Sequence, residues 1–135
     1  MTARPNSGIR LPMALLVAAL VLTVAGGLTL VAQNRKDFAV SARKYSYKIT
    51  AGGSDLKEMR VQVDDMVTIT FSAEDIAHSF TIDAYRIDRR AEPGKPVTIR
   101  FRADKEGKYD IRCTLNIDDR CLKELKGTLI VEARR

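Results

Sequence analysis

Short stretches of alternating hydrophobic and polar residues follow one another from residue 44 to the end of the chain. Such alternation predicts strands, because successive side chains of a strand point to opposite faces. The stretches are KYSYKIT (44–50), MRVQV (59–63), MVTITFS (66–72), HSFTID (78–83), VTIRF (97–101), GKYDIRC (107–113) and KGTLIVEA (126–133). Turn-forming segments such as AGGSD and AEPGKP separate them. The pattern predicts an all-β domain, an antiparallel β-sandwich with a Greek-key arrangement.

One face of each predicted strand must be dry in a sandwich, which gives a candidate core. The expected core residues are Tyr47, Val61, Ile69, Phe80, Ile99, Phe101, Tyr109, Ile111 and Val131. No long helical periodicity competes with the strands, apart from a single turn near DDRCLKEL (118–125).

The N-terminal region has a different pattern, since residues 11–32 contain no charged side chain. A membrane-spanning helix needs about 20 apolar residues, whereas the apolar part of a secretory signal is about 7–15 residues long. We therefore expect a short tail at 1–10, a transmembrane signal-anchor helix at 11–32, a polar linker at 33–43 and the β-domain at 44–135. A cleaved signal is the alternative, with small residues at 25–27 near a plausible cut.

Composition excludes several function classes. The formal net charge is +6, but basic and acidic residues are interspersed rather than clustered, so nucleic-acid binding is not expected. The chain has no glycine-rich phosphate loop, no helix-borne metal motif and no recognisable nucleophile–base arrangement. We predict a protein that is not an enzyme.

Three residues could carry metal or redox chemistry. His78 is the only histidine and starts a predicted strand, while Cys113 and Cys121 are the only cysteines and follow a later strand. Strand ends and loops converge at one end of a sandwich, so an imidazole and two thiols could meet there. A lone histidine at a strand start is otherwise more often a hydrogen-bonded structural residue.

The order of these segments resembles the cupredoxin family. AHSFTI is similar to the strand of the family's first histidine, GKYDIRC to its G-x-Y-x-x-x-C segment and LKGTLIV to its closing M-x-G-x-L-x-V strand. The family includes blue-copper carriers, the copper domain of cytochrome oxidase subunit II and domains of EfeO-type iron-uptake lipoproteins. The resemblance implies a cupredoxin-like fold, copper as the candidate cofactor, and His78 and Cys113 as copper ligands.

The ligand set of the family is incomplete in this chain. A blue-copper site uses two histidines, a cysteine and an axial methionine. Here the loop after Cys113 returns Cys121 instead of a histidine, and Leu125 stands at the methionine position. Three alternatives remain for the loop: a Cys113–Cys121 disulfide, a three-coordinate Cu(I) site made by His78, Cys113 and Cys121, or two free thiols with Cys113 buried.

The resemblance also bears on location and function. The positive-inside rule places the domain in the cytoplasm, because more basic residues follow the uncharged run than precede it. The resemblance implies the opposite, a single-pass cell-membrane protein with an extracytoplasmic domain, which we adopt. We expect a membrane-anchored binding module that binds copper or has lost the metal. The alternatives are an electron-transfer copper protein of a respiratory chain and a structural or assembly partner of a membrane or respiratory complex.

Overall fold

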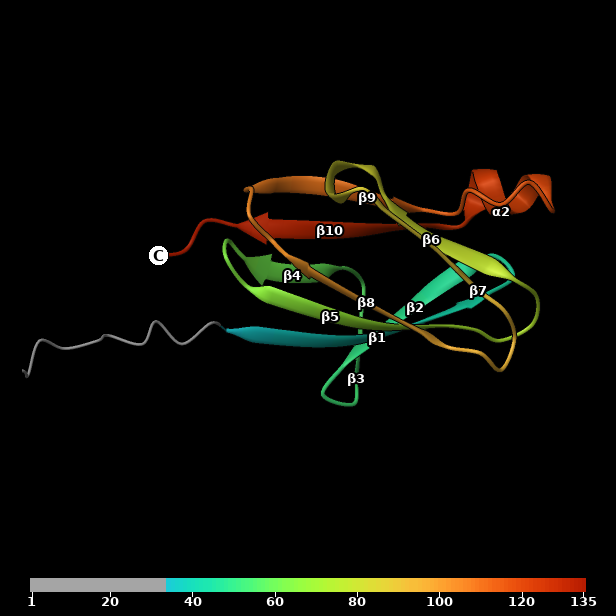
Figure 1. Cartoon of the computed structure of the whole chain (residues 1–135), viewed down its shortest axis with the longest axis horizontal. Helices are drawn as coiled ribbons and strands as arrows, with labels where there is room; N and C mark the ends of the chain where they lie inside the picture. The colour runs from blue at the N-terminus through green and yellow to red at the C-terminus, as the bar shows by residue number, and fades with distance from the viewer. Residues whose placement is uncertain (1–33) are drawn as a thin grey trace, which may run out of the picture. The chain divides into compact units, whose positions relative to one another are not determined.

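The computed structural model of the protein describes residues 34–135, which form two five-stranded β-sheets (Figure 1). The strand order is β3-β2-β1-β5-β8 in the first sheet and β4-β10-β9-β6-β7 in the second. The strands are β1 (Arg35–Arg43), β2 (Ser46–Ala51), β3 (Ser54–Leu56), β4 (Met59–Gln62), β5 (Met66–Ala73), β6 (His78–Ile82), β7 (Ile87–Ala91), β8 (Val97–Arg102), β9 (Gly107–Arg112) and β10 (Lys126–Glu132). Two short helices complete the fold, the 3-10 helix η1 (Asp83–Tyr85) and the α-helix α2 (Asp119–Glu124).

The predicted all-β sandwich and its core are confirmed. Of the expected core residues, Val61, Ile69, Phe80, Ile99, Ile111 and Val131 are buried, and Tyr47, Phe101 and Tyr109 are partly buried against them. Aromatic rings join the two sheets at the centre, since the Phe71 and Phe80 rings lie 5.6 Å apart and both contact the ring of Tyr47.

The prediction of a polar linker at 33–43 was wrong, because residues 35–43 form β1. This strand lies in the middle of the first sheet, antiparallel to β2 and parallel to β5. Phe38, Val40 and Ala42 are buried and alternate with exposed or half-buried residues. The alternation is therefore present, but basic and small residues make the segment resemble a spacer.

Two features of the sandwich differ from the wholly antiparallel prediction. The pairs β1–β5 and β4–β10 are parallel. In addition, β3 and β7 were not predicted as strands. All of β3 is exposed and only Ala91 of β7 is buried, so these edge strands carry no alternating hydrophobic signal.

The predicted tail at 1–10 and signal-anchor helix at 11–32 lie outside the described residues. Within residues 34–135, no helix has the length and hydrophobicity needed to cross a membrane. The folded domain begins earlier than the predicted boundary at residue 44, since β1 belongs to its sheet.

One end of the sandwich collects the segments that carry the candidate site. The helix α2 lies there, between the end of β9 and the start of β10 (Figure 1). The single helical turn expected near residues 118–125 is thus confirmed as α2. The start of β6, at His78, faces the same loop.

Candidate functional site

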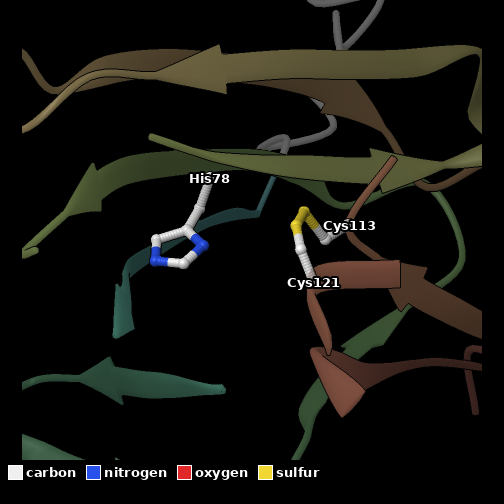
Figure 2. A group of neighbouring side chains, drawn as sticks. All are labelled: His78, Cys113 and Cys121. Carbon is white, nitrogen blue, oxygen red and sulfur yellow. A yellow bond between two sulfur atoms is a disulfide. The ribbon is translucent and has the colours of Figure 1, made fainter. Parts of the chain in front are cut away.

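His78, Cys113 and Cys121 converge in one buried cluster (Figure 2). One ligand atom from each lies within 4.8 Å of the others, and the three residues are 0%, 1% and 2% exposed. Of the three states expected for the cysteine loop, the structure shows the disulfide between Cys113 and Cys121. Their Cα atoms are 5.6 Å apart, inside the range of about 4.4–6.8 Å that a disulfide requires.

The His78 imidazole is held from one side only. Its Nε2 lies 2.7 Å from Oδ1 of Asp75, whereas its Nδ1 is buried and has no hydrogen-bond partner among residues 34–135. Figure 2 shows a ring nitrogen of His78 facing the two sulfur atoms. An unsatisfied buried polar atom costs about 1–3 kcal/mol, so this nitrogen marks a position where a partner is expected.

Asp75 determines which ring nitrogen is free. Burial raises the pKa of Asp75, but hydrogen bonds from the Lys44 and Ile76 backbone N–H groups and from His78 outweigh it and lower this pKa to about 2. The carboxylate is therefore ionised near neutral pH and accepts the N–H of Nε2. In the neutral ring, Nδ1 then presents its lone pair toward the sulfurs.

Hydroxyl groups fix Cys113 relative to His78. Ser79, the residue after His78, accepts a hydrogen bond from the backbone N–H of Thr114, the residue after Cys113, at 2.7 Å. The two hydroxyl oxygens are 3.1 Å apart. In the described part of the chain β6 and β9 share only the backbone pair Thr81–Arg112, so these side chains take over the pairing near the site.

Asp118 positions Cys121 at the start of α2. Its side chain accepts a hydrogen bond from the backbone N–H of Arg120 at 2.9 Å, and its carbonyl accepts one from the N–H of Cys121 at 3.0 Å. Asp118 is thus the N-cap of the helix, the role for which aspartate is among the preferred residues.

Sequence reasoning missed several residues that support the site, namely Asp75, Ser79, Thr114 and the role of Tyr45. The hydroxyl of Tyr45 donates to Oδ2 of Asp118. Tyr47 does pack, and its hydroxyl also donates to the carbonyl of Ser79. The only signal for Ser79 and Thr114 was their position directly after two predicted site residues.

Comparison with known proteins adds the family to this geometry. A family model described as "Cupredoxin-like domain" matches residues 13–131. The chain belongs to the cupredoxin-like domain family.

A known relative of this cupredoxin-like domain is cytochrome c oxidase subunit 2 of Thermostichus vulcanus. The two sequences are 34% identical over 76 residues, which is 55% of this chain and 23% of the relative. The chain therefore spans only about a quarter of the length of that protein.

Solved structures show the same fold. The periplasmic domain of subunit II of cytochrome oxidase from Bradyrhizobium japonicum has a TM-score of 0.62 at 16% identity, covering 73% of this chain and 84% of that one. A chain of a heme-copper terminal oxidase dimer has a TM-score of 0.64 at 21% identity, and the match covers 87% of this chain and 86% of that one. A third match is the structure of a mixed disulfide intermediate between a thioredoxin-like protein and subunit II of cytochrome c oxidase. Its TM-score is 0.61 at 16% identity, and the match covers 73% of this chain and 82% of that one.

The donor set of this cupredoxin-like domain is one imidazole and two cysteine sulfurs. Leu125, at the position where the resemblance expects a methionine, is fully buried and offers no donor atom. The chain has no second histidine. Two thiolates and one imidazole suit a soft metal ion of low coordination number, such as Cu(I), once the disulfide is reduced.

Proposed function

We propose that this cupredoxin-like domain is a non-enzymatic, extracytoplasmic copper-handling module that binds Cu(I) through His78, Cys113 and Cys121. The observation that carries the proposal is Nδ1 of His78, which is buried without a hydrogen-bond partner in the described part of the chain. It belongs to a cluster whose other members are the two sulfur atoms. Removing either sulfur would leave a single thiolate, and removing the imidazole would leave two donors in place of three.

The same two sulfurs serve a disulfide in one state and a metal in the other, because the thiolate is the ligand. Conversion of the disulfide to two thiols takes two electrons and two protons, which a dithiol reductant supplies. One thiolate of the reductant attacks a sulfur of the Cys113–Cys121 pair to form a mixed disulfide. This attack releases the other cysteine as a thiolate, which takes up a proton. The second thiol of the reductant then attacks the reductant's own sulfur in the mixed disulfide and displaces the remaining cysteine thiolate, which is also protonated, so that the reductant leaves as a disulfide.

A thioredoxin-like protein is the class of partner that suits this exchange. The proposal is supported by the subunit II neighbour that forms a mixed disulfide with such a protein. Bound Cu(I) would be held by Cys113 and Cys121 as thiolates and by Nδ1 of His78, while the proton on Nε2 would stay hydrogen-bonded to Asp75.

The extracytoplasmic location is part of the same proposal. The disulfide favours an oxidising compartment, and one structural neighbour is the periplasmic domain of an oxidase subunit. The conflict with the basic residues after residue 32 is smaller than expected, because Arg35, Lys36 and Arg43 belong to the folded strand β1. Long loops and domains are translocated largely regardless of their charge. We propose that residues 11–32 anchor the domain to the membrane.

Electron transfer in a respiratory chain is the second candidate, favoured by the 34% identity to cytochrome c oxidase subunit 2. It would require a copper site that cycles between two oxidation states with little rearrangement. The single histidine and the buried Leu125 argue for tight Cu(I) binding instead. A third candidate, an assembly partner that binds no metal, keeps the disulfide permanently.

Metal analysis of the full-length chain, purified in detergent, tests the proposal. After anaerobic reduction and exposure to Cu(I), we expect stoichiometric copper, and we expect none in the oxidised chain. A C113A/C121A variant provides the control. Absence of copper from the reduced chain would contradict the proposal and favour the assembly partner. A strong visible charge-transfer band from a Cu(II) thiolate would favour the electron carrier.

A further inference from the structure

The turn between β1 and β2, residues Lys44 and Tyr45, contacts both segments that carry the site residues. Lys44 reaches the segment before β6, 31 residues away, and Tyr45 reaches the start of α2, 73 residues away. Neither residue belongs to the cluster of His78, Cys113 and Cys121. The Lys44–Tyr45 turn is therefore connected to both halves of the site without being a ligand.

On the histidine side, the contact runs through Asp75. The backbone N–H of Lys44 donates to Oδ2 of Asp75 at 2.8 Å, and the N–H of Ile76 donates to Oδ1 at 2.8 Å. The same Oδ1 lies 2.7 Å from Nε2 of His78. Both oxygens of the carboxylate are thus held, and the imidazole is oriented by a group that the turn fixes.

On the cysteine side, the contact runs through Asp118. The Tyr45 hydroxyl donates to Oδ2 of Asp118 at 2.5 Å, while Asp118 caps α2 and accepts the N–H of Cys121. The guanidinium of Arg120 lies 3.8 Å from the centre of the Tyr45 ring, and Arg120 also pairs with Glu124 at 2.8 Å. Tyr45 therefore holds the first turn of the helix by its hydroxyl and by its ring face.

We infer that the Lys44–Tyr45 turn is a clamp that sets the distance between His78 and the cysteine pair and keeps the disulfide shut away from attacking thiols. Tyr45 and Asp75 are positioning residues for the site. The metal-binding part of this inference rests on the proposed function, whereas the part on the disulfide does not. The helix α2 has six residues, of which only Cys121 is buried, so packing stabilises it little. Its contacts with the Lys44–Tyr45 turn therefore determine how often α2 unfolds locally and exposes the disulfide.

The first test uses Tyr45→Phe in the full-length chain, which keeps the ring and removes only the hydroxyl. Tyr109→Phe is the matched control, because the Tyr109 hydroxyl also acts as a donor outside the clamp, at 2.8 Å to the Lys105 carbonyl and at 3.4 Å to the Glu106 carbonyl. We expect dithiothreitol to reduce the disulfide about three- to tenfold faster in Tyr45→Phe than in wild type, the range for loss of one partly exposed hydrogen bond. We also expect the equilibrium with glutathione to shift toward the dithiol. Equal rates and equal equilibria in the two variants would overturn the clamp.

The second test measures the Cu(I) affinity of the reduced chain. Asp75→Asn should bind Cu(I) about 10- to 100-fold more weakly, as is typical for loss of a carboxylate that orients a metal-binding histidine. Asp55→Asn is the control, since Asp55 is an exposed carboxylate paired with Lys48 on β2. Unchanged affinity in Asp75→Asn would overturn its positioning role. If wild type binds no Cu(I), the proposed function fails, and the reduction rates of the first test still decide the clamp.

Discussion

Two fully buried polar side chains lie beyond opposite ends of β5, Asp65 just before it and His78 after it. They differ in how they are partnered. Asp65 Oδ1 accepts from Nη2 of Arg134 at 2.8 Å, and its Oδ2 accepts from the backbone N–H of Gln62 at 2.8 Å. His78 is satisfied at Nε2 only, and its Nδ1 lacks a partner among the described residues.

The contrast separates a buried polar residue with all its partners from one that is only partly satisfied, which is the residue that the proposed function uses. The carboxylate of Asp65 links the turn between β4 and β5 to Arg134 in the C-terminal segment. The backbone carbonyl of Asp65 also accepts a hydrogen bond from the N–H of Ala103 at 3.0 Å. A group saturated in this way stabilises the fold. At the His78 end, a nitrogen without a hydrogen-bond partner among the described residues is buried beside two sulfurs, which is the arrangement that the proposed function requires.

The largest expected effect on stability comes from substitution of Asp65, whose two carboxylate oxygens both accept hydrogen bonds. Asp65→Ala leaves the backbone N–H of Gln62 without its acceptor and removes the hydrogen bond between the Arg134 guanidinium and a fully buried carboxylate. We expect the free energy of unfolding to fall by about 2–4 kcal/mol, measured by urea unfolding. Cu(I) affinity of the reduced variant should be unchanged. A change under about 0.5 kcal/mol would show that Asp65 is not a structural counterpart of His78.

Reduction of the disulfide should have the next largest effect. Cys113 and Cys121 are eight residues apart, and opening so short a loop removes about 2–3 kcal/mol in the chain-entropy model. Urea unfolding with and without a reductant measures the difference. Cu(I) should restore stability to the reduced chain, because the folded site holds three donors together and binds the ion more tightly than the unfolded chain does. The C113A/C121A variant should respond to neither the reductant nor Cu(I), and a response in that variant would contradict the role given to the two cysteines.

A smaller effect is expected for the hydroxyl bridge between the two halves of the site. Ser79→Ala removes the acceptor of the Thr114 N–H, and we expect a loss of about 1–2 kcal/mol in urea unfolding. Thr50→Ala is the control, since its hydroxyl makes a long 3.3 Å bond to Ala39 in an exposed position. Equal losses in the two variants would indicate that the bridge adds nothing beyond an ordinary surface hydrogen bond.

The smallest effect on stability should come from the site residue itself. His78→Leu removes a buried nitrogen that is unsatisfied, and Asp75 keeps its two backbone donors. We expect the free energy of unfolding to change by less than about 1 kcal/mol, while the affinity of the reduced chain for Cu(I) falls. A large destabilisation would assign His78 the structural role that we assign to Asp65.

Local patterns were sufficient to predict most of the fold. Period-two alternation identified seven strands, because their buried residues are large and their exposed residues are polar. It failed for β1, where the inward positions include only Phe38, Val40 and Ala42 among basic neighbours. It also failed for β3 and β7, which bury almost nothing. These strands form through pairing with neighbours, which a local pattern does not record.

The same division holds for the candidate site. His78, Cys113 and Cys121 were expected together, since strand ends and a loop meet at one end of a sandwich, and their convergence agrees with that expectation. The contacts of Lys44 with Asp75 and of Tyr45 with Asp118 span 31 and 73 residues. Such hydrogen bonds depend on how the turn is placed in three dimensions, and the spacing of residues along the chain does not predict them.

The most direct test of the central claim is nitrogen NMR of the imidazole, since His78 is the only histidine and its signals need no assignment. With ¹⁵N-labelled full-length chain in detergent, we predict that Cu(I) added to the reduced protein shifts the Nδ1 resonance, while Nε2 remains the protonated nitrogen. The oxidised protein should show no shift. Stoichiometric Cu(I) binding to the reduced chain with both imidazole resonances unchanged would contradict the claim, because His78 would then not be a ligand.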